Sequence, residues 1–208
     1  MRVRLGSRRP VTGGGLREEV SARRSAGAAW DHAAVGAPEL KTKRLRLSRP
    51  VTTDSSGVFA ILADPRTAEH NPSDRLEDRG EASELVERWV RHWEEHGFGY
   101  WCVRESGSNR IIGYAGVKWM PMHGRTVLNL VYRFLPEVWG RGFASEAAAA
   151  IVSRVLDEMP EEVIVARVRP DNRPSQNVAL KAGLHRDATM DCQGEDGLDL
   201  AYTSRDVN

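Results

Sequence analysis

The chain has little cysteine, little net charge and no long apolar run. Its 208 residues include two cysteines, Cys102 and Cys192, which are too few for a disulfide scaffold and show no metal-ligand spacing. No apolar stretch approaches the roughly 20 residues that a membrane-spanning helix needs. A formal net charge of +1 argues against a protein that holds nucleic acid mainly by charge. We therefore expect a globular domain in the cytoplasm, without a metal, a membrane or a nucleic acid as its partner.

Residues 1–38 differ in composition from the rest of the chain. Seven arginines against three acidic residues give this segment a net charge of +4. Its apolar side chains are few and small, and Gly13-Gly14-Gly15 interrupts any regular element. We predict a disordered basic extension over residues 1–38 and a globular domain over residues 39–208. A basic arm for RNA or for a protein partner is the alternative for the extension.

The apolar periodicity after residue 39 predicts helices and strands around one sheet. Helical spacing is present at residues 53–62, 81–96, 144–159 and 174–181. Strand patterns are present at residues 43–48, 99–104, 110–119, 126–134 and 163–168, with a final hairpin at 184–191 and 198–203. Residues 126–134 are almost continuously apolar, which is typical of a strand buried on both faces. This order of elements predicts a mixed α+β fold.

A loop with two glycines, Trp139-Gly140-Arg141-Gly142-Phe143-Ala144, lies between a predicted strand and a predicted helix. Glycine lets the backbone approach a ligand closely. The first amides of a helix have no intrahelical partner and carry partial positive charge. We therefore predict a phosphate site at this helix start, with Arg141 adding a full charge. A turn that only starts the helix is the alternative, since the loop lacks the endings of the P-loop and dinucleotide motifs.

A second polar segment, from Asn172 to Asn177, follows a predicted strand and opens the next helix. Asn172 suits the N-cap position of that helix, and Ser175 in the first turn suits a capping role as well. Neither residue alone distinguishes a structural role from a chemical one.

Together the two segments resemble the GNAT superfamily of acyl-CoA N-acyltransferases. The shared pattern is Leu-Pro-x-x-Trp-Gly-x-Gly-x-Ala-x-Glu-Ala at residues 135–147, followed by Asn-x-x-Ser-x-x-Val at 172–178. The segments 43–47 and 113–116 fit the branch that includes the ribosomal-protein N-terminal acetyltransferases RimJ and RimL. The resemblance implies a mixed, mostly antiparallel sheet of about six to seven strands, flanked by about four helices, with a splayed strand pair at the cofactor site.

The resemblance also implies the reaction, which is direct transfer of an acetyl group from acetyl-CoA to a primary amine. The amine would belong to a protein N-terminus or to a small molecule. In the family the loop at 139–144 holds the CoA pyrophosphate, and the preceding strand holds the pantetheine arm. The implied cofactor contacts are Val131, Tyr132, Arg133, Phe134, Trp139, Gly140, Arg141, Gly142, Phe143, Ala144, Asn172, Ser175 and Asn177.

Two catalytic groups that are common in the family are missing from this chain. Ala179 matches the tyrosine acid of the last helix, and Asn129 matches the strand glutamate. An asparagine cannot accept a proton at neutral pH. This leaves Ser175 as the candidate acid for the leaving thiolate, with a capping role as its alternative. His123, water or another side chain is left as the candidate base, and a surface histidine is the alternative interpretation of His123.

The polar segment at 66–79 should border the acceptor amine, and its carboxylates could attract a cation. Those carboxylates are Glu69, Asp74, Glu77 and Asp78. Substrate contacts are expected from His70, Trp119 and Asn129, and His70 is a second candidate base. Because the usual acid and base are missing, a catalytically weak acyl-CoA-binding regulatory module is the alternative function. A homodimer is compatible with the resemblance.

Overall fold

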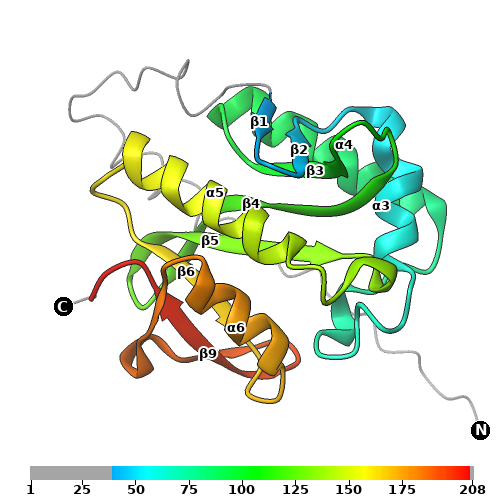
Figure 1. The fold of residues 1–208 in the computed structure, drawn as a ribbon. Coiled ribbons are helices and arrows are strands. Elements are labelled where there is room, and N and C mark those ends of the chain that lie inside the picture. The colour runs from blue at the N-terminus through cyan, green and yellow to red at the C-terminus, as the bar shows by residue number, and fades with distance from the viewer. Residues whose placement is uncertain (1–38, 207–208) are drawn as a thin grey trace, which may run out of the picture. The chain divides into compact units, whose positions relative to one another are not determined.

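The computed structural model describes residues 39–206, so the extension predicted at 1–38 lies outside the described residues. Within that range four α-helices flank one sheet (Figure 1). The helices are α3 Ser55–Leu62, α4 Arg79–His96, α5 Phe143–Glu158 and α6 Arg173–Lys181. The strands are β1 Glu39–Lys41, β2 Leu45–Ser48, β3 Tyr100–Glu105, β4 Ile111–Met122, β5 Arg125–Phe134, β6 Ile164–Val168, β7 His185–Arg186, β8 Cys192–Gly194 and β9 Gly197–Thr203.

The sheet is mixed and mostly antiparallel, which confirms the predicted fold class. Its strand order is β1-β2-β3-β4-β5-β6-β9-β7, and β8 pairs with β9 outside this path. β5 and β6 are the one parallel pair among the described strands. There are nine strands rather than six or seven, because β1, β7 and β8 are only two or three residues long and leave no periodic pattern.

Helix α4 shows how local signals set the boundaries of an element. The Asp78 carboxylate accepts a hydrogen bond from the Glu81 amide at 3.0 Å, and the Glu81 carboxylate accepts one from the Asp78 amide at 3.3 Å. This capping box starts the helix two residues before the predicted position. Gly97, with φ at 75°, ends the helix in the left-handed conformation. The buried stripe of the helix includes Trp89 and Trp93, as the spacing predicted.

The two faces of the sheet are covered by different helices. Tyr114 and Arg133 are register partners on β4 and β5, so their side chains share one face. Trp89 of α4 packs on the Tyr114 ring at 4.8 Å, which places α4 over that face. Tyr132 points to the opposite face, where its hydroxyl bonds to Ser175 of α6. Helices α5 and α6 lie together on this second side (Figure 1).

Strand β5 is not buried on both faces along its length, and that prediction is wrong for its second half. Val127 and Leu128 are fully buried, whereas Asn129 and the residues 131–133 are only partly buried. The reason is that β6 stops pairing with β5 after Asn129. The apolar run therefore serves the core in its first half and borders an opening in its second half. No helix among residues 39–206 is long and apolar enough to cross a membrane.

The close pairing of β3 with β4 provides a test of this architecture. Tyr100 is the register partner of Gly116, and a Cβ atom on Gly116 would lie 2.6 Å from the Tyr100 Cα. Backbone atoms cannot move aside as a flexible side chain can, so we expect Gly116→Ala to destabilise the fold by about 1–3 kcal/mol. A thermal melt would report this as a decrease of roughly 2–4 °C per kcal/mol.

A matched glycine controls for the substitution itself. Gly107 lies in a turn with φ at +82°, and a Cβ there would meet no atom within 4 Å. Gly107→Asn should lower the melting temperature less than Gly116→Ala does, because asparagine tolerates the left-handed region better than most residues. Equal melting temperatures for Gly116→Ala and the wild type would contradict the β3–β4 register.

Candidate active site

The candidate site is a cleft that opens where two strands separate. β5 and β6 pair only at Leu128↔Ile164 and Asn129↔Val165. Beyond these pairs β6 continues alongside β9, while β5 stays bonded to β4 as far as Phe134. Pro136, which has no amide hydrogen, follows at the end of β5. The resulting cleft has a volume of about 860 Å³ and is lined by both strands, the starts of α5 and α6, and the segment at 66–76.

The start of α5 presents free backbone amides to this cleft. Gly140 and Gly142 have φ values of 76° and 77°, which a side chain would disfavour. Gly142 is the N-cap residue, and no side chain caps the helix. Within residues 39–206, the amides of Phe143, Ala144 and Ser145 receive no hydrogen-bond partner. Together with the helix dipole, these amides are suited to binding a phosphate.

The loop before α5 is held by two arginines. The Glu146 carboxylate accepts hydrogen bonds from the Thr42 hydroxyl at 2.6 Å and from the Arg44 amide and Nε at 2.9 and 2.6 Å. Arg44 Nη1 also donates to the Arg141 carbonyl at 2.9 Å. The Arg141 side chain pairs with Glu105 at 2.8 and 3.0 Å and does not line the cleft. Arg141 therefore positions the loop rather than adding its charge to the cleft.

The start of α6 forms the opposite wall. The Asn172 Oδ1 atom accepts a hydrogen bond from the Ser175 amide at 3.0 Å, so Asn172 is the cap and Ser175 is not. The Ser175 hydroxyl donates to the Tyr132 hydroxyl oxygen at 3.1 Å, and Tyr132 donates to the Ser175 carbonyl at 2.7 Å. Burial raises the pKa of Tyr132 to about 12, so the phenol keeps its proton at neutral pH. This geometry leaves the Ser175 hydroxyl free of a capping role.

Most of the expected cofactor contacts line one continuous cleft. Along β5 these are Val131, Tyr132, Arg133 and Phe134, and after it Trp139, Gly140, Gly142, Phe143 and Ala144. From α6 they are Asn172, Ser175 and Asn177. Trp139 is half exposed, and its Nε1 donates to the Phe134 carbonyl at 2.8 Å. Arg133 differs from Tyr132 because its side chain turns to the other face of β5.

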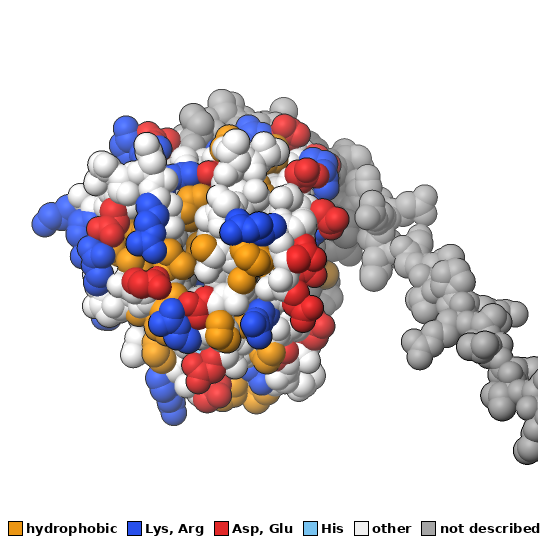
Figure 2. All heavy atoms as spheres, turned by 90° about the vertical axis from the view of Figure 1, so that its right-hand side faces the viewer, with side chains coloured by type: hydrophobic (Ala, Val, Ile, Leu, Met, Phe, Trp, Pro, Cys, Tyr) orange, Lys and Arg blue, Asp and Glu red, His pale blue; other side chains and the backbone are white. Residues whose placement is uncertain are grey.

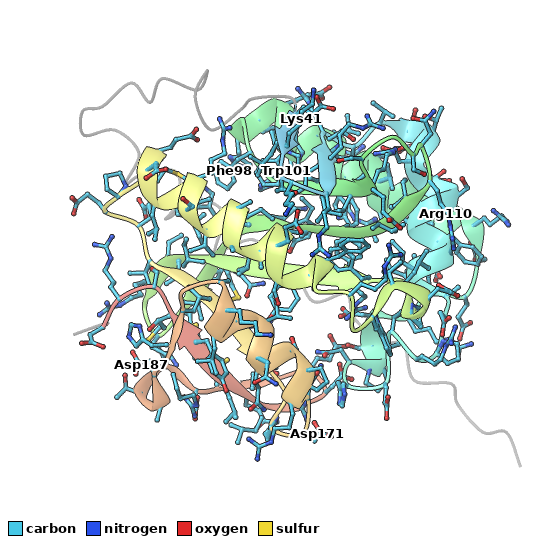
Figure 3. The ribbon with its side chains drawn as sticks, viewed as in Figure 1. Lys41, Phe98, Trp101, Arg110, Asp171 and Asp187 are labelled. Atoms are coloured by element: carbon cyan, nitrogen blue, oxygen red, sulfur yellow. The ribbon has the colours of Figure 1, made fainter. Side chains whose placement is uncertain are left out.

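The predicted acid–base and substrate residues are divided between the cleft and other parts of the fold. His70 and Asn129 line the cleft, and His70 Nδ1 lies 3.3 Å from an Asp171 carboxylate oxygen. Asp171 is labelled near the start of α6 in Figure 3. His123 lies in the β4–β5 turn, where its Nε2 is 3.2 Å from the Asp191 carbonyl oxygen. Trp119 packs edge-on against Phe98. Neither His123 nor Trp119 lines the cleft, because the long hairpin carries both away from it.

The acidic segment provides fewer free carboxylates than its sequence indicated. Glu69 and Asp74 line the cleft, whereas Asp78 caps α4 and Glu77 is not among the lining residues. Asp74 forms an ion pair with Arg133 at 2.6 Å, so its charge is already neutralised. Figure 2 shows acidic and basic side chains intermixed on the face that lies to the right in Figure 1. Within residues 39–206, no group of three or more His, Cys, Asp or Glu side chains could hold a metal ion.

The Glu146 contacts predict a pH dependence of stability. Burial disfavours the charged carboxylate, but the hydrogen bonds from Thr42 and Arg44 outweigh it and hold the pKa of Glu146 below its usual 4.5. A carboxyl group with a lowered folded pKa stabilises the fold above its unfolded pKa and loses this effect as pH falls through the folded pKa. We expect Glu146→Gln to cost about 1 kcal/mol at pH 7, and the deficit to shrink as pH falls toward 3.

Urea unfolding at several pH values measures this deficit. Glu94→Gln is the matched control, because Glu94 is exposed and lies 3.9 Å from Arg49. This control should change stability little at any pH. A Glu146→Gln deficit that stays constant from pH 7 to pH 3 would contradict the assignment.

Comparisons with known proteins agree with this geometry. Residues 44–185 match the family model described as "Acetyltransferase (GNAT) domain". The uncharacterized protein YkkB of Bacillus subtilis (strain 168) is 28% identical over 153 residues, which are 73% of this chain and 88% of YkkB. An acetyltransferase structure from Agrobacterium tumefaciens str. C58 has a TM-score of 0.68 at 24% identity, covering 82% of this chain and 95% of that one. The ribosomal L7/L12 alpha-N-protein acetyltransferase RimL, solved with CoA, has a TM-score of 0.65 at 13% identity, covering 78% and 94%.

Proposed function

Because the chain belongs to the GNAT family of acetyltransferases, we propose that it transfers the acetyl group of acetyl-CoA to a primary amine bound in the cleft between β5 and β6. The observation that supports this most directly is the position of the free α5 amides at one end of that cleft. The amine belongs to a small molecule or to a protein N-terminus. The loss of the usual acid and base positions keeps a non-catalytic acyl-CoA-binding module as the rival function.

The cleft has the groups that acetyl-CoA requires. The amides of Phe143, Ala144 and Ser145 would hold the pyrophosphate, whose charge suits the positive end of the helix dipole. The β5 backbone beyond Asn129 has lost its partner on the β6 side, so its amides and carbonyls are open to the pantetheine arm. The side-chain oxygen of Asn172 is occupied in capping α6, which leaves the side-chain nitrogen to bond to the same arm.

The reaction needs a neutral amine, a stabilised oxyanion and a proton for the leaving thiolate. The neutral amine attacks the thioester carbon, a backbone amide of β5 stabilises the oxyanion, and the carbon–sulfur bond breaks. The Ser175 hydroxyl donates to the Tyr132 hydroxyl oxygen at 3.1 Å in this structure. Ser175 is proposed to turn this hydrogen toward the sulfur, to protonate it and to regain a proton from solvent. His70 replaces His123 as the proposed base, because His70 lines the cleft and His123 does not. In this role His70 takes the proton that the attacking nitrogen loses as the amide forms.

The pyrophosphate assignment predicts opposite effects on folding and on cofactor binding. Ser145 lies in the first turn of α5 and lines the cleft. An aspartate there interacts favourably with the helix dipole, by about 0.3–1 kcal/mol, but repels a phosphate. We expect Ser145→Asp to melt at or above the wild-type temperature and to bind acetyl-CoA at least about tenfold more weakly.

Ser145→Asn is the neutral control for that experiment, and it should retain most of the affinity. Binding is measured by the thermal shift that acetyl-CoA produces over a range of concentrations. Unchanged acetyl-CoA affinity in Ser145→Asp would contradict the placement of the pyrophosphate.

The role of Ser175 is tested by its alanine variant. Because Asn172 caps α6, Ser175→Ala should cost little stability. We expect kcat to fall by about 10²-fold, as for other positioned acids, while acetyl-CoA binding changes little because the loss is confined to the transition state. Release of free thiol with an accepted amine gives kcat, and a melting curve checks the fold. A stable variant with the wild-type kcat would remove Ser175 from the mechanism. If no amine in a broad panel supports thiol release, that result would favour the rival binding module.

A further inference from the structure

An arginine with an unused hydrogen-bond donor lies at the acceptor end of the cleft. The Arg133 side chain is 13% exposed, and its Nη2 donates to an Asp74 carboxylate oxygen at 2.6 Å. Its other terminal nitrogen, Nη1, is buried and has no hydrogen-bond partner among the described residues. A buried charged donor without a partner is costly, so a ligand that supplies an acceptor atom would relieve it.

Two tyrosines surround this arginine with further donors. Tyr114 is the register partner of Arg133, and the Tyr100 and Tyr114 rings are 6.0 Å apart. Both rings line the cleft, and burial raises the pKa of each phenol well above its usual value, so both are protonated at neutral pH. No hydrogen bond joins either hydroxyl to another residue between 39 and 206. This end of the cleft therefore offers N–H and O–H donors to a ligand.

The wall beside these donors is apolar. The Trp89 ring packs on Tyr114 at 4.8 Å and on Tyr100 at 5.4 Å, and it is almost fully buried. Leu76 and Leu85 line the same part of the cleft. Contact with such a wall favours a ligand with an aliphatic or aromatic body.

From this arrangement we infer that the acceptor amine carries a carboxylate, which Arg133 binds together with the Tyr100 and Tyr114 hydroxyls. The acceptor class is an amino acid with an apolar side chain. This inference rests on the proposed acetyl transfer and adds the chemical class of the acceptor. An arginine N–H bound to a carboxylate forms a charge-assisted hydrogen bond, which is stronger than a neutral one.

A polycationic acceptor fits the cleft less well. The two aspartates that line it already face cations: Asp74 bonds to Arg133, and Asp199 lies 3.5 and 3.7 Å from Arg167 and Arg169. A polyamine would have to displace these partners, whereas a carboxylate meets a donor that is not in use.

Matched acceptor pairs test the inference. L-phenylalanine is compared with phenethylamine, and L-leucine with 3-methylbutylamine, by thiol release from acetyl-CoA at fixed pH. We expect kcat/KM for each amino acid to exceed that of its decarboxylated partner. Arg133→Gln should reduce this ratio by about 10²-fold, the size typical for truncating one partner of a buried charged pair. Arg133→Lys, which keeps the charge, should restore part of it.

Arg91→Gln is the matched control. Arg91 lies on helix α4 but is exposed, lies 3.8 Å from Glu87 and does not line the cleft. The ratio should not change in this variant. A peptide with phenylalanine at its N-terminus has no carboxylate next to its amine. Its rate of thiol release therefore distinguishes acetylation of a protein N-terminus from acetylation of a free amino acid.

A binding measurement separates this inference from the proposed function. N-acetyl-L-phenylalanine and its amide are added to the CoA-loaded protein, and thermal shifts are recorded for the wild type and Arg133→Gln. A shift that needs both the carboxylate and Arg133 supports the inference even if no amine is acetylated, in which case only the proposed transfer fails. Equal shifts for acid and amide, or equal losses of kcat/KM for both members of a pair, would overturn the inference.

Discussion

Strand β5 keeps its partner on one edge and loses it on the other, and both walls of the cleft depend on this difference. β4 stays paired with β5 from Met122↔Arg125 to Gly113↔Phe134, whereas β6 pairs with only two residues. The continuous β4 ladder holds the strand straight while its other edge has unpaired backbone groups. Without that support an unpaired edge inside a sheet would close on its neighbour or fray. The separation of β5 from β6 thus follows from the pairing of the strands themselves.

Alternation along β5 then divides the site between the two faces of the sheet. Tyr132 meets Ser175 on the face covered by α6, and Arg133 meets Asp74 on the face covered by α4. Neighbouring residues of a strand must point to opposite faces. The reacting groups would approach each other through the gap between the strands, with the β5 backbone next to both. In the proposed reaction, one strand would therefore determine the spacing between the cofactor and the acceptor.

Local periodicity was sufficient to predict the long elements but not the contacts between them. Helix α4 and strands β3 to β5 lie within about three residues of their predicted bounds, because burial of one face leaves a repeated pattern. The loop at 139–144 and Asn172 followed from a motif in which backbone and capping needs restrict the residue types. The ion pairs of Arg44 with Glu146 and of Asp74 with Arg133 could not be predicted, because the partners lie 102 and 59 residues apart in the chain. His123 was misplaced because sequence alone does not show where a hairpin turn points.

The two walls of the cleft come from separate stretches of the chain. The wall proposed for the cofactor is built from residues 139–145 and 172–178, and the wall proposed for the acceptor from residues of the segment 69–89 with Tyr100 and Tyr114. Substitutions in the second set leave the α5 amides and the cap of α6 untouched. A lineage with this fold can therefore acquire a new acceptor through a few changes on one face, while selection keeps the acetyl donor constant on the other. Among these positions, Arg133 would tolerate the fewest substitutions, because it is adjacent to Tyr132 on β5.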